Sequence, residues 1–425
     1  MKRVICLMLS ALMLLSAAGC GAAPSKAKPV GRGVEDLMAQ ITARTVTESE
    51  DLTAHGAALT DFAVRLLQAA GREGENVLVS PLSVLYALAM TANGARGETL
   101  AQMEAALGMD RDTLNRYCSA LRQSLTEQED GRLDAANSIW FTEASRFTPE
   151  QDFLQRNADY YGADIYRAPF DDSTLQDING WVKEKTHGMI PQILDRIPQS
   201  AIMYLVNALA FEAEWPEPYE KGQIWEGTFT LADGTERTVE FMHGEEHTFL
   251  RDQHAKGFVK YYKGGRYAFA ALVPDEGVSL EEYAASLTGE RLHELLAAAL
   301  LSSLPRTVMT AIPKFETDYD TELSEALRAM GMTDAFEAAR ADFADLGHSE
   351  AGNIYIGRVL HKTFLSMAEQ GTRAGAATVV EMRDECAYIG EEPETVNLDR
   401  PFVYMLLDLE TLAPFFIGSM LDPAA

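Results

Sequence analysis

A run of unusually small side chains near the C-terminus constrains the fold more than any other part of the sequence. Residues 369–380 read Glu-Gln-Gly-Thr-Arg-Ala-Gly-Ala-Ala-Thr-Val-Val. Alternate residues of a strand share a face, and one face here is uncharged throughout: Thr372, Ala374, Ala376, Thr378, Val380 and Met382. Such a strand can enter between strands already packed on a core, where bulky or charged groups would be excluded. A small-residue linker is the alternative.

The next residues, 384–394, are polar and acidic and contain Gly390 and Pro393, which is typical of an exposed loop. A strand-like segment with one narrow face therefore leads directly into a long surface loop. This order predicts a piece of chain that is exposed in one state and inserts into a sheet in another.

The N-terminus has the layout of an export signal. Lys2 and Arg3 precede an apolar run, 4–18, that is short for a membrane span, and Gly19-Cys20 follows. The segment resembles a bacterial lipoprotein signal, which implies cleavage after residue 19 and lipidation of Cys20. We expect an exported cell-surface or extracytoplasmic lipoprotein that touches the membrane only through this anchor. An ordinary secretory signal with an incidental cysteine is the alternative.

Residues 20–50 lack a sustained core pattern and predict a lipidated N-terminus followed by a flexible tether. Beyond them the sequence shows no internal repeat, second linker or break in composition, so residues 51–425 are predicted to form one domain. The 425-residue chain is 47% hydrophobic, which is sufficient for a sizeable core.

The charge disfavours nucleic acid and anionic surfaces as partners. The formal net charge of −28 becomes −30 once Lys2 and Arg3 are removed with the signal. The four cysteines, Cys6, Cys20, Cys118 and Cys386, show neither metal-type spacing nor a disulfide framework.

Hydrophobic periodicity predicts an α+β fold in which helices dominate the first half and strands the second. Helices are expected at 51–70, 82–90, 99–107, 112–126, 149–161 and 175–185, with Ser80 as the N-cap of the second and Pro81 in its first turn. Strands are expected at 134–141, 201–210, 227–231, 236–242, 258–262, 266–273, 308–315, 355–366, 402–408 and 415–420. Asp233-Gly234 and Gly264-Gly265 predict two hairpins.

Enzyme motifs are missing from the sequence. No Gly-x-Ser-x-Gly elbow, P-loop, dinucleotide fingerprint or His-Glu-x-x-His helix is present. His243 and His247 have the spacing of a helical metal pair, but they fall in a hairpin-rich stretch without a third ligand. Cys386 and His361 could form a thiol-imidazole pair. A catalytic cysteine has to be rigidly placed, however, and Cys386 lies in the predicted loop. A lipoprotein enzyme is therefore disfavoured.

Several motifs together resemble the serpin family, in order from residue 51 to 422. They are Asn76–Ser83, Asn93–Thr99, Ile178–Val182 with Thr186–Ile190, Leu205–Ala208 with Trp215, Ile312–Phe315, His361-Lys362, the small-residue stretch, Arg400–Phe402 and Phe416–Gly418. The resemblance implies the serpin fold: three β-sheets, about nine α-helices and an exposed reactive-centre loop, here at about 369–398, that can insert as a strand.

The resemblance also implies a suicide-substrate inhibitor rather than an enzyme. A target serine protease, with cysteine proteases as a further class, would cleave the loop and be trapped as an acyl-enzyme while the hinge strand enters the central sheet. Insertion of the serpin loop is a known example of adding a strand to a sheet and of releasing stored strain. We expect a monomer without cofactor or metal whose partner is a covalently bound protease. A non-inhibitory serpin acting as a binding or structural surface protein is the alternative.

Matching positions imply three groups of site residues. The hinge comprises Glu369, Gly371, Thr372, Ala374, Gly375, Ala376, Ala377 and Thr378. The shutter, a polar cluster under the sheet, comprises Ser80, Ser83, Asn207 and His361, and the breach at its top comprises Trp215, Lys314 and Glu369.

The reactive bond is less well defined. Counting seventeen residues from Glu369 gives Glu385–Cys386, with Arg383, Ala387 and Tyr388 as alternative sites. Two departures from the family pattern bear on this region. Arg373 replaces a usual Glu on the outward face, and the span from Thr372 to Pro401 is several residues too long.

Overall fold

The structure is a computed structural model of the chain. It describes residues 33–48, 50–72, 74–125, 131–143, 147–198, 201–302, 306–350, 352–372 and 393–425. The lipidation residue Cys20, the hinge beyond Thr372 and every candidate for the reactive bond lie outside these residues. No helix among the described ranges is long and apolar enough to cross a membrane.

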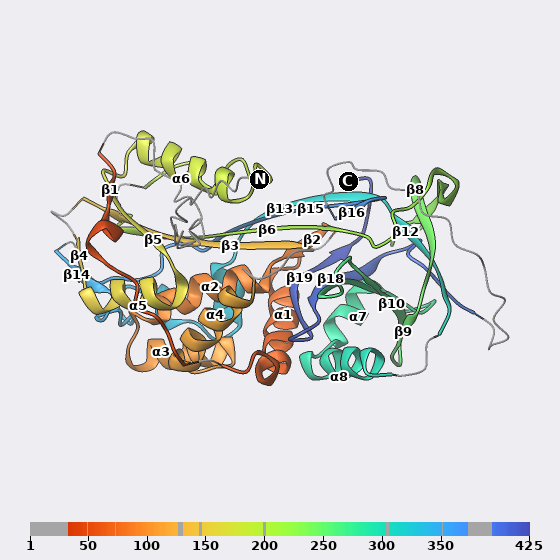
Figure 1. The fold of residues 1–425 in the computed structure, drawn as a ribbon, viewed down its shortest axis with the longest axis horizontal. Coiled ribbons are helices and arrows are strands. Elements are labelled where there is room, and N and C mark those ends of the chain that lie inside the picture. The colour runs from red at the N-terminus through yellow and green to blue at the C-terminus, as the bar shows by residue number, and fades with distance from the viewer. Residues whose placement is uncertain are drawn as a thin grey trace, which may run out of the picture.

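A seven-stranded mixed sheet runs through the molecule (Figure 1). Its strands, in spatial order, are β1 (Glu35–Asp36), β5 (Asp164–Ala168), β3 (Arg132–Thr142), β6 (Met203–Glu214), β16 (Gly371–Thr372), β15 (Leu360–Ala368) and β13 (Phe315–Glu322). The pairs of this sheet are antiparallel except for β3 with β5. The two-residue strand β16 separates β6 from β15.

Three further sheets complete the strand content of the described residues. A six-stranded sheet follows the order β2 (Val77–Val79), β19 (Ala413–Met420), β18 (Phe402–Asp408), β11 (Tyr267–Pro274), β10 (Ala255–Tyr261) and β9 (Thr248–Arg251). A four-stranded sheet contains β17 (Glu394–Asn397), β12 (Val308–Pro313), β8 (Glu236–Glu246) and β7 (Ile224–Thr230). The ribbon of β14 (Gly347–Ser349) and β4 (Phe147–Pro149) is the fourth.

The described residues also form nine α-helices: α1 (Gly56–Ala70), α2 (Pro81–Ala92), α3 (Gly97–Leu107), α4 (Arg111–Leu125), α5 (Gln151–Tyr161), α6 (Asp172–Lys185), α7 (Leu280–Ser286), α8 (Gly289–Leu300) and α9 (Ser324–Ala329). Figure 1 shows α6 on one face of the seven-stranded sheet, with α1 to α5 and the six-stranded sheet on the other. The main core fills the second side, while α6 packs through a smaller apolar cluster that includes Ile178, Trp181, Trp140 and Val206.

Local sequence signals account for α2, the most buried helix. The Ser80 hydroxyl accepts a hydrogen bond from the Ser83 N–H, and Pro81 occupies the first turn, where its missing N–H costs nothing. The run after it is apolar on nearly all sides, and ten of its twelve residues are buried. The predicted cap, first turn and burial are confirmed.

Three predicted boundaries are wrong. The strand expected at 308–315 is two strands, β12 and β13, in different sheets, because the chain changes sheet at Lys314 while its apolar pattern continues. The strand expected at 355–366 begins only at Leu360. The strand expected at 201–210 runs instead from Met203 to Glu214, and Met203, Leu205 and Asn207 are only half-buried.

Part of the segment expected to be a tether lies on the domain. β1 pairs with the edge strand β5, and Leu37 is buried in the core. The Arg44 guanidinium contacts the buried Asp159 carboxylate, with Nη2 2.8 Å from Oδ2. Packing thus begins ahead of Asp51, at about residue 35. The few apolar residues of this segment are too widely spaced to produce a periodic pattern in the sequence.

Candidate functional site: the gap between β6 and β15

The hinge already forms a small wedge between two strands of the central sheet. Gly371 pairs with Ala368 of β15 on one side and Glu214 of β6 on the other, and Thr372 pairs with Met367 and Ala213. Gly371 has φ of +145°, and a Cβ there would lie 2.1 Å from the Ala213 carbonyl oxygen. Only glycine fits this position.

Thr372 faces inward from this wedge. It is 2% exposed, and its hydroxyl hydrogen-bonds the Tyr262 hydroxyl. A small cavity lies directly below it between β6 and β15, lined by Phe211, Leu365, Leu406, Phe416 and Met189 among others. The sheet is thus bridged at its top by two hinge residues and has unfilled space beneath them.

The predicted breach residues meet where the wedge begins. The Trp215 indole N–H donates to the Ala368 carbonyl oxygen at 3.1 Å, and its backbone N–H donates to that of Gln370 at 2.9 Å. Lys314 Nζ lies 3.1 Å from a Glu369 carboxylate oxygen and 3.2 Å from one of Glu240. Contacts made by Trp215, Lys314 and Glu369, which are far apart in the sequence, therefore fix the segment that leads into the hinge.

Electrostatics favour the charged forms of this lysine and Glu369. Partial burial works against the charged lysine, but hydrogen bonds to Glu369 and Glu240 outweigh it and raise the pKa of Lys314. A backbone hydrogen bond and the neighbouring ammonium lower the pKa of Glu369 despite its partial burial. Because Lys314 is 30% exposed, solvent screens much of this attraction.

The predicted shutter is only partly assembled as a hydrogen-bonded unit. The Ser80 backbone N–H donates to His361 Nε2 at 3.0 Å, and the Ser80 hydroxyl donates to the Phe415 carbonyl oxygen at 3.0 Å. His361 is 4% exposed, and burial lowers its pKa to about 4, so the imidazole is neutral at pH 7. Ser80 and His361 therefore connect the N-terminus of α2 to the start of β15, and Ser83 joins them only through its hydrogen bond to Ser80.

Asn207 lies apart from this cluster, on β6. Its side-chain amide donates to the Asn137 Oδ1 of β3 at 2.8 Å, and its own Oδ1 is buried without a hydrogen-bond partner among the described residues. No hydrogen bond joins Asn207 to His361 in the described part of the chain. A buried acceptor without a donor carries a cost that a change in strand spacing could relieve.

Tyr262 is a site residue that the sequence prediction missed. Its ring stacks on Trp215 at 4.4 Å between centroids and 7° between planes, and its hydroxyl meets Thr372. It follows β10 at the predicted hairpin, where an aromatic residue is ordinary. Nothing in its local pattern pointed to the hinge.

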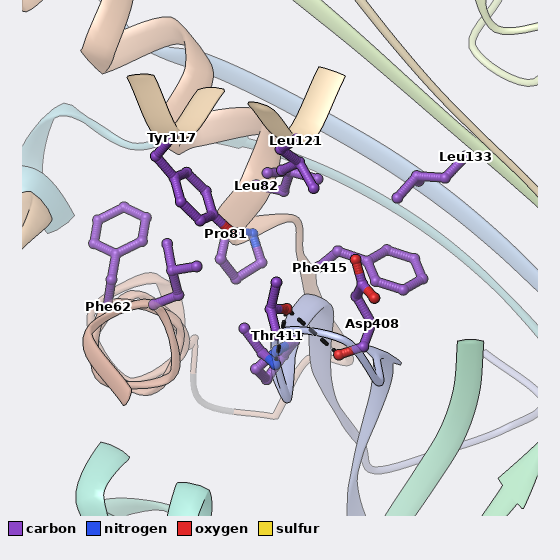
Figure 2. Close-up of a pocket in the computed structure, with 12 residues that line it drawn as sticks. Phe62, Pro81, Leu82, Tyr117, Leu121, Leu133, Asp408, Thr411 and Phe415 are labelled. Atoms are coloured by element: carbon purple, nitrogen blue, oxygen red, sulfur yellow. Dashed lines mark hydrogen bonds between the residues drawn. The ribbon is translucent and has the colours of Figure 1, made fainter. Parts of the chain in front are cut away.

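A second cavity lies on the helical side, among α1, the start of α2, α4 and the turn between β18 and β19. Figure 2 shows its walls, which are mainly apolar and include Phe62, Leu82, Tyr117 and Phe415. The Thr411 hydroxyl on this turn donates to the Asp408 carbonyl oxygen and accepts from the Ala413 N–H. These polar groups serve the turn, and the cavity lies outside the site around β16.

The residues considered for other chemistry do not converge in the described ranges. No group of three or more His, Cys, Asp or Glu side chains suited to a metal ion is found there. His243 stacks on Trp225 at 3.5 Å in the strand pair β7–β8, and the exposed His247 lies beyond the end of β8. Cys118 is buried as a free thiol, and burial raises its pKa, which makes it unreactive.

The overall architecture and the hinge wedge match a known class of fold. The model of a protein family described as serpin (serine protease inhibitor) matches residues 57–423. The chain belongs to the serpin family, and its fold is the serpin fold.

Similar proteins give a finer comparison. The native state of the thermophilic serpin Tengpin is 45% identical with a TM-score of 0.85, covering 92% of this chain and 100% of that one. Its latent state is 44% identical with a TM-score of 0.77, covering 90% and 100%. Leukocyte elastase inhibitor A of Rattus norvegicus is 28% identical over 82% of this chain and 93% of that protein.

Proposed function

We propose that this chain is an inhibitory serpin, a suicide-substrate inhibitor of serine proteases, with cysteine proteases as a further target class. A protease attacks the loop after the hinge and forms an acyl-enzyme. The hinge strand then enters the gap between β6 and β15 before the ester hydrolyses, and the covalent complex persists. The protein acts on proteases without being an enzyme itself, and it works as a monomer.

The observation that carries this proposal is the position of β16. Gly371 and Thr372 already pair with both neighbouring strands, so insertion extends an existing strand and needs no new nucleus. The inward positions that follow, Ala374, Ala376 and Thr378, are small. They can enter without burying a charge, which would cost several kcal/mol. The fold is more similar to the native state of Tengpin, with a TM-score of 0.85, than to its latent state, with 0.77.

The breach and shutter residues have matching roles in the proposal. Trp215, Lys314 and Glu369 fix the point from which the strand zips inward. The bond from Ser80, which also accepts from Ser83, to His361 holds the start of β15 against α2 until the strands part. The Asn207 side-chain oxygen, which has no partner among the described residues, then gains a hydrogen-bond donor. None of them takes part in bond making.

The reactive bond and the cellular address are proposed from sequence alone. The bond is Glu385–Cys386, with cleavage at Arg383, Ala387 or Tyr388 as the alternatives set by the lengthened loop. Residues 1–19 are a signal peptide, and Cys20 carries a lipid that holds the domain at the cell surface. A protease on the same side of the membrane is therefore the partner.

The direct test is incubation of the domain with trypsin-, chymotrypsin-, elastase- and Glu-specific proteases. We expect one of them to give a covalent complex stable in SDS, and mass spectrometry of the released C-terminal peptide then locates the bond. Cleavage of the loop by all four without any complex would favour the non-inhibitory alternative and contradict the proposal.

A pair of hinge variants tests insertion itself. Ala376→Glu places a charge at an inward position that follows β16, so the protein should become a substrate that is cleaved without forming complex. Ala377→Glu adds the same charge at the neighbouring outward position and should keep the complex yield. Equal yields from both variants would argue against insertion of this strand.

A further inference from the structure

A buried ion pair lies beside the ring of Trp215, outside the residues assigned to the site so far. Lys260 on β10 and Glu246 at the end of β8 meet with 2.6 Å between Nζ and Oε1. Their side chains are only 11% and 10% exposed. Lysine and glutamate rarely lie so deep unless they are paired, and removing one partner leaves an uncompensated buried charge.

The ammonium of this pair also faces two aromatic rings. Lys260 Nζ lies 4.9 Å from the centroid of Trp215 and 4.7 Å from that of Tyr219. Both distances are within the range of cation–π attraction, which is strongest where water is excluded. Lys260 therefore binds a carboxylate and two rings at once, and β8, β10 and the segment after β6 converge on it.

The same two aromatic residues hold the chain that leads into the hinge. Trp215 donates to the carbonyl oxygens of Ala368 and Gln370, and the Tyr219 backbone N–H donates to that of Glu369 at 2.9 Å. Three consecutive carbonyl groups are thus bound by residues whose rings rest on Lys260. Tyr262 adds a stacking contact to Trp215 and a hydrogen bond to Thr372.

We propose that the Lys260–Glu246 ion pair is a positioning device: it fixes Trp215 and Tyr219, and through them it sets how tightly residues 368–370 are held at the top of the gap. Glu246 keeps the ammonium in place, and the ammonium orients the rings. The consequence for inhibition rests on the proposed function. A loosely held segment changes the rate of strand insertion relative to the rate at which the acyl-enzyme is hydrolysed.

The pair can be disrupted without adding volume. Glu246→Gln leaves Lys260 without a counter-ion, and Lys260→Met removes the cation but keeps a similar unbranched chain. In both variants we expect the backbone amides of Trp215 and Tyr219 in the full-length protein to exchange with deuterium at least about tenfold faster, since their acceptors become mobile. The amide of Ala208, which faces β3 in the β3–β6 ladder, should keep its rate.

Two controls separate positioning from general stability. Arg251→Met breaks an exposed bidentate pair with Asp275, at 2.7 and 2.9 Å, and should leave exchange at both amides unchanged. The double variant Lys260→Met/Glu246→Leu leaves no buried charge unpaired, so it should recover resistance to urea. Exchange at Trp215 and Tyr219 should nevertheless stay fast, because no cation faces the rings.

Three results would overturn the proposal. They are wild-type exchange at Trp215 and Tyr219 in the single variants, a uniform acceleration that includes Ala208, and slow exchange at Trp215 and Tyr219 in the double variant. The exchange measurement needs no protease. A chain that forms no covalent complex would therefore count against the proposed function alone, while the exchange rates would still decide the role of the ion pair.

Discussion

At the residue scale, the hydrogen bond that joins the start of β15 to α2 depends on a neutral histidine. His361 Nε2 accepts the Ser80 backbone N–H, which an imidazolium could not do, and burial lowers the pKa of His361 to about 4. In the unfolded chain the same side chain titrates near 6.5. Between these two values the unfolded chain binds a proton that the folded protein does not, so stability is present above about pH 6.5 and declines as the pH falls toward 4.

We therefore expect acidification from pH 7.5 to 5 to reduce the resistance of the protein to urea by about 2 kcal/mol through this residue. The measurement is the midpoint of the first unfolding transition at both pH values. His361→Gln keeps an acceptor and does not titrate, so its midpoint should change less over the same interval. Identical pH dependence in the two proteins would rule out His361 as the group responsible.

The residues of the site were predictable to unequal degrees. Ser80 and Pro81 carry a local cap signal, and Trp215, Lys314 and Glu369 were identified through motifs in the right order. Asn207 was expected beside His361, but the structure gives it Asn137 as its partner. Tyr262, Lys260 and Glu246 act through contacts between distant strands, and no local pattern marks a side chain for such a contact.

At the scale of elements, α6 is the part most able to resist separation of β6 from β15. It covers the face of the sheet opposite the main core (Figure 1), and its own cluster includes Val206 and Ala208 of β6. The chain after α6 is also tied to it, since the Asn179 side-chain oxygen accepts the N–H groups of Ile193 and Leu194 at 2.9 Å. Met189 in this segment lines the cavity under Thr372.

A conservative change under α6 should therefore accelerate spontaneous loop insertion. Ile178→Val removes one methylene from a fully buried site and should cost about 1 kcal/mol, with a rate increase of up to about fivefold if the contact is lost before insertion. The rate can be followed as loss of protease-binding capacity at elevated temperature.

The matched control is Ile417→Val in β19, which removes the same group from the main core. It should lower stability to urea by a similar amount and leave the insertion rate near that of the wild type. Equal acceleration by both variants would mean that α6 has no special part in the process.

Most elements were predictable because their periodicity is uninterrupted. The helices from α1 to α6 and the hairpins of β7–β8 and β10–β11 appear within a few residues of their expected positions. Helices α7, α8 and α9 were not predicted, although α7 has a capping box and α8 a threonine N-cap. The misplaced strands share another cause, which is tertiary contact without local pattern. β12 and β13 join at Lys314 with no break in alternation, and β1 is recognisable as a strand only because β5 is there to pair with it.

At the scale of the whole molecule, the serpin fold holds the central sheet open at one position. β16 supplies two residues between β6 and β15, although each of these neighbours continues for several residues beyond it. In the described residues β16 is the strand between β6 and β15, and the facing edges of these two strands are the surface that the inserted loop would fill. Under the proposed mechanism, insertion of the cut loop would add stability that the uncut chain lacks.

Cutting the loop should release that stability. Insertion as far as Met382 would add ten residues, 373–382, to β16. At about 1 kcal/mol net for each new backbone hydrogen bond, the gain is on the order of 10 kcal/mol, equivalent to a rise in Tm of roughly 10–15 °C for a domain of this size. The measurement is a calorimetric or circular-dichroism melt before and after limited proteolysis. Ala376→Glu, cleaved in the same way, should melt near the temperature of its uncut form, because the glutamate cannot enter the sheet without burying its charge. If the cut wild-type chain melted at its original temperature, the gap between β6 and β15 would not be an acceptor for the loop.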